Sequence, residues 1–270
     1  LNELSNTDRL SKNLVVDKLN ISAGTLKAME QLGDIIIETD TGYRNPVKKI
    51  EQKAYDIILN EQQRQVSENI KKTMDFRKDS KPNIHLIHGI TGSGKTEVYI
   101  DLIDYTISKG KAVIVLIPEI ALTYQTVMRF TRRFGDRVSI INSRLSKGER
   151  YDQFERAKNG DVDIMIGPRS ALFTPFKNLG LIIIDEEHES AYKSESVPKY
   201  HATEVAIKRA KDVGATLVLG SATPSVESYY RAKNGAYKLH VLNKREKGNL
   251  PEVHVVDLRE ELKNENKSIF

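Results

Sequence analysis

Residues 84–99, with the sequence IHLIHGITGSGKTEVY, constrain the fold more than any other part of the chain. Their first half is an apolar run with β-branched residues, which predicts a strand. The glycines that follow allow positive φ values and a close approach of the backbone. From Gly89 the residues fit the pattern G-x-x-x-x-G-K-[ST], in which backbone N–H groups and a helix N-terminus surround a polyphosphate. A glycine turn with an incidental lysine is the alternative, but the predicted strand before it and helix after it favour a phosphate-binding loop.

The phosphate-binding loop gives its polar residues expected roles. Lys95 is expected to reach the β and γ phosphates, and the Thr96 hydroxyl is expected to hold Mg²⁺. The expected nucleotide contacts of the loop are Gly89, Thr91, Gly92, Ser93, Gly94, Lys95 and Thr96. The chain is therefore expected to bind a nucleoside triphosphate together with Mg²⁺.

Beyond residue 55, apolar strands alternate with helical stretches. Continuous apolar runs with helices between them are typical of a parallel sheet that is covered on both faces. The expected strands are 84–87, 112–117, 138–141, 162–166, 181–184 and 216–219. The sequence therefore predicts an α/β fold, namely a P-loop (RecA-like) parallel sheet with helices on both faces.

The first fifty residues follow a different pattern. Leu26, Met29 and Leu32 recur at helical spacing, and residues 34–44 indicate a strand, a turn and the start of a second strand. Together with the apolar segment 14–19, this order predicts a small winged-helix module. Such modules often bind DNA through their second helix. Basic and acidic residues balance here, so DNA binding and a spacer or protein-contact role both stay open.

Composition narrows the class of protein. The chain of 270 residues contains no cysteine, which excludes disulfides and thiolate zinc sites. It has no apolar run long enough to cross a bilayer and no secretory signal, so a cytoplasmic protein without membrane partners is expected. The sequence starts at Leu1 and stops in a polar stretch, from which a fragment of a longer protein is expected.

The net charge of +5 is concentrated in one segment. Residues 129–150 hold seven basic and two acidic side chains, and the basic ones include Arg129, Arg132 and Arg133. A solvated helix face could account for part of this excess. A surface that meets phosphate accounts better for its concentration, so contact with a nucleic-acid backbone is expected.

Two acidic residues follow the predicted strand 181–184. In P-loop enzymes an aspartate at the end of such a strand holds Mg²⁺, and a following glutamate can polarise the attacking water. Asp185 and Glu186 fit these roles, and with Lys95 they are the expected catalytic residues. Thr96 and Asp185 are the expected Mg²⁺ ligands. An ordinary acidic loop is the alternative, but two halves of one site rarely occur together by accident, so hydrolysis is favoured over binding alone.

The acidic motif has the form D-E-x-H, and GSATPS follows a later apolar strand at residues 220–225. In this order behind the phosphate loop, the motifs resemble those of superfamily 2 helicases. Taken alone, S-A-T indicates a small-residue turn. In the helicases such loops relay the nucleotide state to the nucleic-acid side, so the resemblance implies that His188, Ser221 and Thr223 couple the two sites.

Longer segments resemble the replication-restart helicases within this superfamily, from about residue 59 to about residue 258. These segments are GITGSGKTEVY, IPEIALTYQ, SRLSKGER, GPRSALFTPF, LIIIDEEHESAYKSESVPKYHA and GSATPSVES. The resemblance implies that Gln63 reads the adenine of ATP. It also implies that single-stranded DNA faces a set of residues from three segments, namely Pro118, Glu119, Thr123, Gln125, Arg169 and Ser170.

In the replication-restart helicases an aromatic-rich loop directly after the D-E-E-H motif is thought to sense DNA. The resemblance gives this role to Tyr192, Lys193, Tyr200 and His201. Aromatic rings stack on any base and lysines hold the backbone, although core packing of the two tyrosines is the alternative. Four positions depart from the family's usual residues and put individual DNA contacts in doubt. They are Asn142, Pro168, Lys199 and Thr203.

The resemblance also implies a domain organisation and a function. A winged-helix module is expected at 1–50, the ATP-binding helicase lobe at 51–245, and a lead-in to an absent second lobe at 246–270. The implied function is a DNA-dependent ATPase that moves 3′ to 5′, acts at stalled or branched forks and assembles the primosome. Its implied partners are single-stranded and branched DNA, primosome and helicase-loading proteins, and single-stranded DNA-binding protein. Zinc is expected only in the absent part of the parent.

Two other interpretations stay open. One is a different superfamily 2 translocase that serves restriction or repair, and the other is a nucleotide-gated DNA- or protein-binding module without turnover. Since the arginines of the second lobe are missing, the isolated chain is expected to be a poor ATPase. Arg129, Arg132 and Arg133 are expected to strengthen DNA binding without rescuing hydrolysis.

Overall fold

The computed structural model describes residues 16, 21–36, 57–75, 82–245, 256 and 259. The chain divides into two compact units, residues 1–42 and residues 43–270, and each is described by itself. The domain limits expected after residues 50 and 245 stay predictions.

Helix α3, Ala23–Leu32, is the described element of the N-terminal unit. Ser22 caps it by accepting a 3.1 Å hydrogen bond from the Thr25 N–H, and Gly33 ends it with a φ of 78°. The helix predicted from the spacing of Leu26 and its apolar neighbours is therefore confirmed. Most of the predicted wing and of the apolar segment 14–19 lies outside the described residues, so the winged-helix module stays a prediction.

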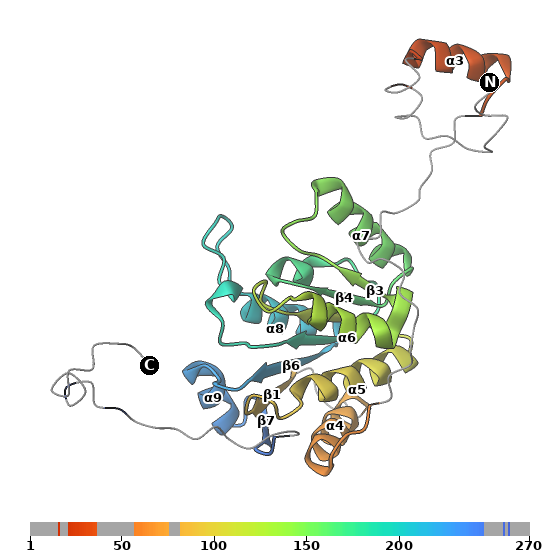
Figure 1. Cartoon of the computed structure of the whole chain (residues 1–270). Coiled ribbons are helices and arrows are strands. Elements are labelled where there is room, and N and C mark those ends of the chain that lie inside the picture. Colours follow the sequence, from red (N-terminus) through yellow and green to blue (C-terminus); the bar gives the residue numbers. More distant parts are fainter. Residues whose placement is uncertain are drawn as a thin grey trace. The chain divides into compact units, whose positions relative to one another are not determined.

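The larger unit is built on a seven-stranded sheet in the order β3-β4-β2-β5-β6-β1-β7, and every neighbouring pair is parallel (Figure 1). All six predicted strands are present. The strands are β1 (Asn83–Gly89), β2 (Ala112–Leu116), β3 (Val138–Ile140), β4 (Ile164–Gly167), β5 (Leu179–Ile184), β6 (Thr216–Ser221) and β7 (Lys238–Leu242). Because the carboxyl ends of parallel strands meet at one edge, the motifs that follow them are brought together.

Helices cover both faces of the sheet (Figure 1). They are α4 (Glu61–Asp75), α5 (Lys95–Ser108), α6 (Tyr124–Phe134), α7 (Lys147–Asn159), α8 (Ala202–Val213) and α9 (Val226–Lys233). Helices α4, α5 and α6 share one hydrophobic core, and α7, α8 and α9 share the other. On β2, Val113 and Val115 belong to the first core while Ile114 and Leu116 belong to the second. Burial of both faces explains the continuous apolar runs and confirms the predicted fold class.

Strand β7 was not predicted. It pairs with β1 at the edge of the sheet, where Lys238 is exposed and His240 is half-buried, so its residues form no continuous apolar run. The imidazole of His240 lies 2.9 Å from Nδ1 of the buried His85. Across the described residues, no helix combines the length and the apolar composition that a bilayer crossing needs.

Candidate active site and nucleic-acid face

Residues 89–96 form a tight turn between β1 and α5. Gly92 and Gly94 have φ values of 79° and 80°, in the left-handed region that favours glycine. A Cβ on Gly89 would lie 2.6 Å from Ser93 Oγ, so the turn needs glycine there as well. Ser93 Oγ is buried and makes no hydrogen bond with the described residues. An unsatisfied buried hydroxyl inside a glycine cradle fits a loop that holds phosphate.

The Lys95 ammonium lies inside this turn. Its side chain is 9% exposed, and Nζ donates a 2.9 Å hydrogen bond to the Gly89 carbonyl and lies 3.8 Å from Glu186 Oε1. A buried ammonium needs such acceptors, and phosphate oxygens could replace them. Lys95 therefore lies inside the loop, and its contact with the β and γ phosphates stays a prediction.

Gln63 contacts the turn from α4. Its side chain is fully buried, Nε2 donates a 3.0 Å hydrogen bond to the Ser93 carbonyl, and Oε1 accepts a 2.9 Å bond from the Asn60 N–H. The structure thus brings Gln63 against the phosphate-binding loop. Its predicted contact with adenine stays a prediction.

Asp185 follows β5, beside α5. Its Oδ1 accepts a 3.0 Å hydrogen bond from the Tyr99 hydroxyl. Burial, followed by the negative charge of Glu186, raises the pKa of Asp185 to about 6. A cation beside Asp185 would favour its ionised form and lower this pKa.

The oxygens of this site suit Mg²⁺. Carboxylate and hydroxyl oxygens such as those of Asp185 and Thr96 are its preferred ligands, and it is usually held by one or two of them together with phosphate oxygens. Within the described ranges, no group of three or more His, Cys, Asp or Glu side chains could hold a metal ion alone. The Asp185 carboxylate and the Thr96 hydroxyl are oxygen ligands of the kind that fit an ion also bound to phosphate.

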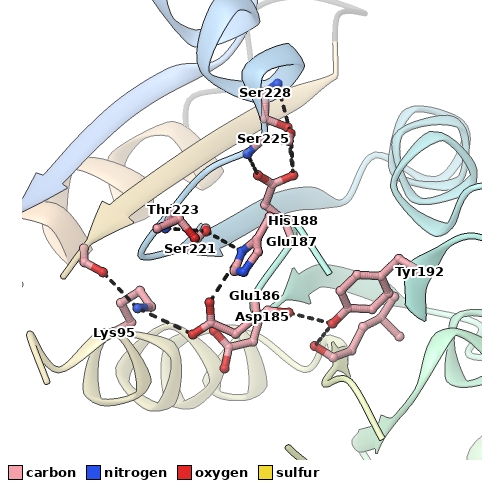
Figure 2. Close-up of polar contacts among 12 residues, drawn as sticks. Lys95, Asp185, Glu186, Glu187, His188, Tyr192, Ser221, Thr223, Ser225 and Ser228 are labelled. Atoms are coloured by element: carbon pink, nitrogen blue, oxygen red, sulfur yellow. Dashed lines mark hydrogen bonds and ion pairs between the residues drawn. The ribbon is translucent and has the colours of Figure 1, made fainter. Parts of the chain in front are cut away.

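The Glu186 carboxylate lies between Lys95 of the phosphate-binding loop and His188 of the acidic motif. Its Oε1 lies 3.8 Å from Lys95 Nζ and its Oε2 lies 3.6 Å from His188 Nδ1 (Figure 2). Its φ of 47° is the one positive value of a non-glycine residue in the described part of the chain. Such conformations cost about 1–3 kcal/mol and occur often at functional sites.

The three predicted coupling residues form one chain of hydrogen bonds (Figure 2). His188 Nδ1 and the hydroxyl of the fully buried Ser221 are 2.7 Å apart, and Ser221 Oγ accepts a 2.9 Å bond from the Thr223 N–H. The acidic motif and the end of β6 are thereby joined directly. The geometry agrees with a coupling role, which stays a prediction.

Glu187 was missed by the sequence-based assignment. This buried carboxylate accepts hydrogen bonds from the Ser225 N–H at 2.7 Å, the Ser225 hydroxyl at 3.1 Å and the Ser228 hydroxyl at 2.9 Å (Figure 2). Ser225 is also the N-cap of α9, so a negative charge sits at the helix N-terminus, where it is stabilised. The sequence does contain a signal for this helix start, because Ser225 and Ser228 are spaced by three residues, as in helix N-capping motifs.

The segments expected to face DNA surround a cavity of about 280 Å³. Its lining residues are Pro118, Glu119, Asn142, Ser143, Arg150, Pro168, Arg169, Ser170, Ala191 and Tyr192. Glu119 accepts a 2.9 Å hydrogen bond from the Ser143 N–H, and the bonds from Ser143 hold the pKa of Glu119 below its usual range. Five of the residues predicted to contact or sense DNA thus line one cavity, namely Pro118, Glu119, Arg169, Ser170 and Tyr192.

Residues 56–226 match the family described as type III restriction enzyme, res subunit. The chain belongs to this family of superfamily 2 helicases. The replication restart protein PriA of Bacillus subtilis (strain 168) is 47% identical over 258 residues, which cover 94% of this chain and 31% of that protein. PriA of Haemophilus influenzae (strain ATCC 51907 / DSM 11121 / KW20 / Rd) is 39% identical over 251 residues, 93% of this chain and 31% of that protein. The chain therefore spans about a third of the length of these relatives.

A solved structure of RecG bound to a three-way DNA junction has a TM-score of 0.52 and 21% sequence identity to this chain. The match covers 85% of this chain and 27% of that chain. At this identity the similarity concerns the fold alone, and it agrees with the parallel P-loop sheet of a superfamily 2 helicase.

The expectation that Tyr192 offers its ring to DNA needs correction in this helicase lobe. Its side chain is 1% exposed, and its hydroxyl lies 2.6 Å from the Asp185 carbonyl and 3.1 Å from the Leu116 carbonyl. In this structure the ring packs in the core and is not exposed for stacking on a base, although Tyr192 also lines the cavity. Tyr192 instead packs in the core, which was the alternative interpretation. Its buried hydroxyl has two carbonyl acceptors at the ends of β5 and β2.

The other residues of the aromatic-rich loop lie nearer the surface. Tyr200 is half-buried and its ring meets that of the exposed Phe173 edge to face, with centroids 5.5 Å apart. Lys193 is exposed, and its bridge to His201 closes the base of the loop. His201 caps α8 by accepting a 3.3 Å hydrogen bond from the Thr203 N–H. Phe173 was not predicted, although it lies in the segment GPRSALFTPF.

Arg169 supports the aromatic-rich loop. Its Nη1 donates hydrogen bonds to the Ala191 carbonyl at 2.9 Å and to the Lys193 carbonyl at 2.8 Å. The predicted DNA contacts Thr123 and Gln125 lie apart from the cavity, at the start of α6, where both are exposed and Thr123 is the N-cap.

The three arginines that were expected to strengthen DNA binding lie on α6, and this role stays a prediction. Arg129 forms an ion pair with the buried Glu97, and Arg133 forms one with Asp104 at 2.7 Å. Both carboxylates lie on α5, so two of the three guanidinium groups hold α6 against the neighbouring helix. Arg132 is exposed on α6.

Arg245 is a further residue that the sequence analysis did not single out. Its Cγ lies 4.0 Å from the point where a Cβ on Gly92 would lie, which places an arginine beside the phosphate-binding loop. The Asn243 side chain nearby accepts a 2.8 Å hydrogen bond from Gln62 of α4. Because β7 was not predicted, the position of the segment that follows it could not be inferred.

Proposed function

We propose that this chain is the ATP-binding lobe of a DNA-dependent ATPase that moves 3′ to 5′ along DNA and restarts stalled replication forks. The observation that carries the proposal is the meeting of the phosphate-binding loop, Asp185, Glu186 and the His188–Ser221 bond at one edge of the sheet. ATP and Mg²⁺ are the proposed cofactors, and single-stranded and branched DNA the proposed substrates. Primosome and helicase-loading proteins and single-stranded DNA-binding protein are the proposed partners, and the cytoplasm the proposed location.

In the proposed mechanism, the residues around the loop act on the phosphates and on the attacking water. Mg²⁺ offsets negative charge on the phosphate oxygens when it is bound. Thr96 and Asp185 would hold the ion, and the Lys95 ammonium, which is bonded to the Gly89 carbonyl in this structure, would bind the phosphates. Glu186 orients the water and accepts its proton on the carboxylate.

The proposed DNA face is connected to Asp185 by two hydrogen-bonded steps. Arg169 lines the cavity and binds the carbonyls on either side of Tyr192, whose hydroxyl is bonded to the Asp185 carbonyl. A phosphate that binds Arg169 would compete with these carbonyls. Binding of DNA would thereby shift the backbone at Asp185, which is a physical route from DNA to the ATP site.

The rings of Phe173 and Tyr200 should be needed for the stimulation of ATP hydrolysis by DNA, whereas Tyr192 should be needed for folding. In the complete enzyme, Phe173→Ala with Tyr200→Ala should leave basal ATP hydrolysis near normal and raise the single-stranded DNA concentration for half-maximal stimulation. Stacking is worth about 1–3 kcal/mol per base, which corresponds to a rise of roughly 5- to 150-fold. Phosphate release titrated with DNA measures this effect, with the exposed Tyr230→Ala of α9 as the control.

Tyr192→Ala should instead lower basal and stimulated rates together. Removal of a buried aromatic side chain costs about 3–5 kcal/mol of folding stability, so its thermal unfolding midpoint should fall. A Tyr192→Ala enzyme with a normal basal rate and no DNA stimulation would contradict a purely structural role and would assign Tyr192 to DNA sensing, through its hydrogen bond to Asp185 or through a direct contact.

A different superfamily 2 translocase is the alternative, and the matched family's description as a restriction enzyme subunit favours it. The complete enzyme should release phosphate faster on a forked DNA than on a linear duplex of the same length if it restarts replication. An equal or higher rate on the linear duplex would support the alternative. No phosphate release with any of these DNAs would support a binding module without turnover.

A further inference from the structure

Tyr99 lies one helical turn after Lys95 on α5, so both side chains project from the same face of the helix. The Tyr99 side chain is 1% exposed, and its hydroxyl donates the 3.0 Å hydrogen bond to Asp185 Oδ1. A buried tyrosine hydroxyl needs a polar partner. Here the partner is the carboxylate proposed to hold Mg²⁺.

A glycine in β6 makes room for the Tyr99 hydroxyl. A Cβ on Gly220 would lie 1.6 Å from Tyr99 Oη and 2.8 Å from Tyr99 Cζ, so any side chain at Gly220 would displace the ring. Gly220 lies within a regular strand without a positive φ, so space rather than backbone conformation calls for glycine. Its carbonyl accepts a 3.0 Å hydrogen bond from the Glu187 N–H. Gly220, the first residue of the GSAT motif, therefore leaves the space that the Tyr99 hydroxyl occupies.

The apolar surroundings of Tyr99 give no other reason for a hydroxyl. Its ring belongs to the core shared with Ile87, Ile183 and Val218. A phenylalanine would fill the same volume and bury the same apolar surface. The difference between the two side chains is the bond to Asp185.

We infer that Tyr99 is a positioning residue that fixes one oxygen of Asp185 and thereby presents the other oxygen to Mg²⁺. This inference rests on the proposed function, in which Asp185 is a metal ligand. A hydrogen bond to Oδ1 restricts the rotation of the carboxylate, so less freedom is lost when the ion binds to Oδ2. Partners behind metal ligands typically change metal affinity or activity by roughly 10- to 100-fold when they are removed.

Calorimetry with a non-hydrolysable ATP analogue tests this inference on the 270-residue chain. Titrations with Mg²⁺ and with EDTA separate the metal-dependent part of the affinity from the rest. In Tyr99→Phe the affinity in EDTA should equal that of the wild type, while the gain from Mg²⁺ should shrink roughly 10-fold or more. The Mn²⁺ concentration that gives half-maximal binding, followed by electron paramagnetic resonance, should rise by the same factor.

Tyr105→Phe is the matched control. Tyr105 lies on the same helix, and its hydroxyl is bonded to Asp75 away from the phosphate-binding loop, so this change should alter neither titration. Gly220→Ala should reproduce the loss of Tyr99→Phe because it displaces the ring. If a thermal melt shows that Gly220→Ala is unfolded at the temperature of the titration, the result for Tyr99→Phe alone tests the inference.

Equal Mg²⁺ dependence in Tyr99→Phe and the wild type would overturn the inference. A loss of affinity that is the same in EDTA as in Mg²⁺ would overturn it too, because it would assign Tyr99 to the packing of the loop. Failure of the proposed function is a separate result: the wild-type chain would then bind the analogue no better than Lys95→Ala does.

Discussion

Lys95→Ala abolishes nucleotide binding by this chain if the loop at residues 89–96 holds phosphate. The Lys95 ammonium is buried between the Gly89 carbonyl and Glu186, at the point where the β and γ phosphates are proposed to lie. Hydrogen bonds to charged groups are worth about 1.5–3 kcal/mol each, so the loss of contacts to two phosphates should weaken binding by more than about 100-fold. Calorimetry with an ATP analogue and Mg²⁺ measures the affinity directly.

Lys109→Ala is a suitable control for Lys95→Ala. Lys109 follows the last turn of α5 and is largely exposed, so its removal takes away a positive charge without touching the loop. Its affinity should match that of the wild type. An unchanged affinity in Lys95→Ala would contradict the assignment of the loop.

The second large effect concerns hydrolysis by the 270-residue chain itself. It should turn over ATP roughly 10³- to 10⁵-fold more slowly than a form extended through the proposed second lobe, because arginine fingers have that worth in comparable sites. Asp185 and Glu186 can place the ion and the water, but charge that builds on the γ phosphate needs further cations. Arg129 and Arg133 are bound to carboxylates of α5 and so do not supply them.

A side-by-side phosphate-release assay checks this expectation, with saturating single-stranded DNA in both reactions. Comparable turnover by the two forms would show that one lobe suffices. Arg245 would then be the first arginine to replace, since it lies beside Gly92 of the phosphate-binding loop. A strong loss of turnover in Arg245→Ala would identify a cation supplied within the lobe.

Local patterns were enough to predict the parallel sheet, the loop at Lys95 and the acidic pair at Asp185. Each of these depends on residues that are close in sequence, and the parallel sheet then brings the strand ends together. The interactions that were missed join distant residues. Tyr99 lies 86 positions from Asp185, and Ser225 lies 38 positions from Glu187.

The role of Tyr192 could not be predicted for a related reason. Its neighbours Ala191 and Lys193 are exposed, so the local sequence has the character of a surface loop. Burial of its ring is decided by the ends of β2 and β5, whose carbonyls accept its hydroxyl. The pairing of Arg129 and Arg133 with α5 depends in the same way on how two helices pack.

The register of the three adjacent strands β5, β6 and β1 sets the positions of the residues in the proposed chemistry. Ile184 pairs with Leu219, which in turn pairs with Leu86, and the strands then lead into Asp185, Ser221 and the phosphate-binding loop. A slip of one residue along a strand is a displacement of about 3.3 Å, longer than any hydrogen bond in the site. The distances between the reacting groups are therefore set in steps by the backbone. Gradual adjustment of this lobe, by evolution or by design, is left to the loops and to the outward faces of its helices.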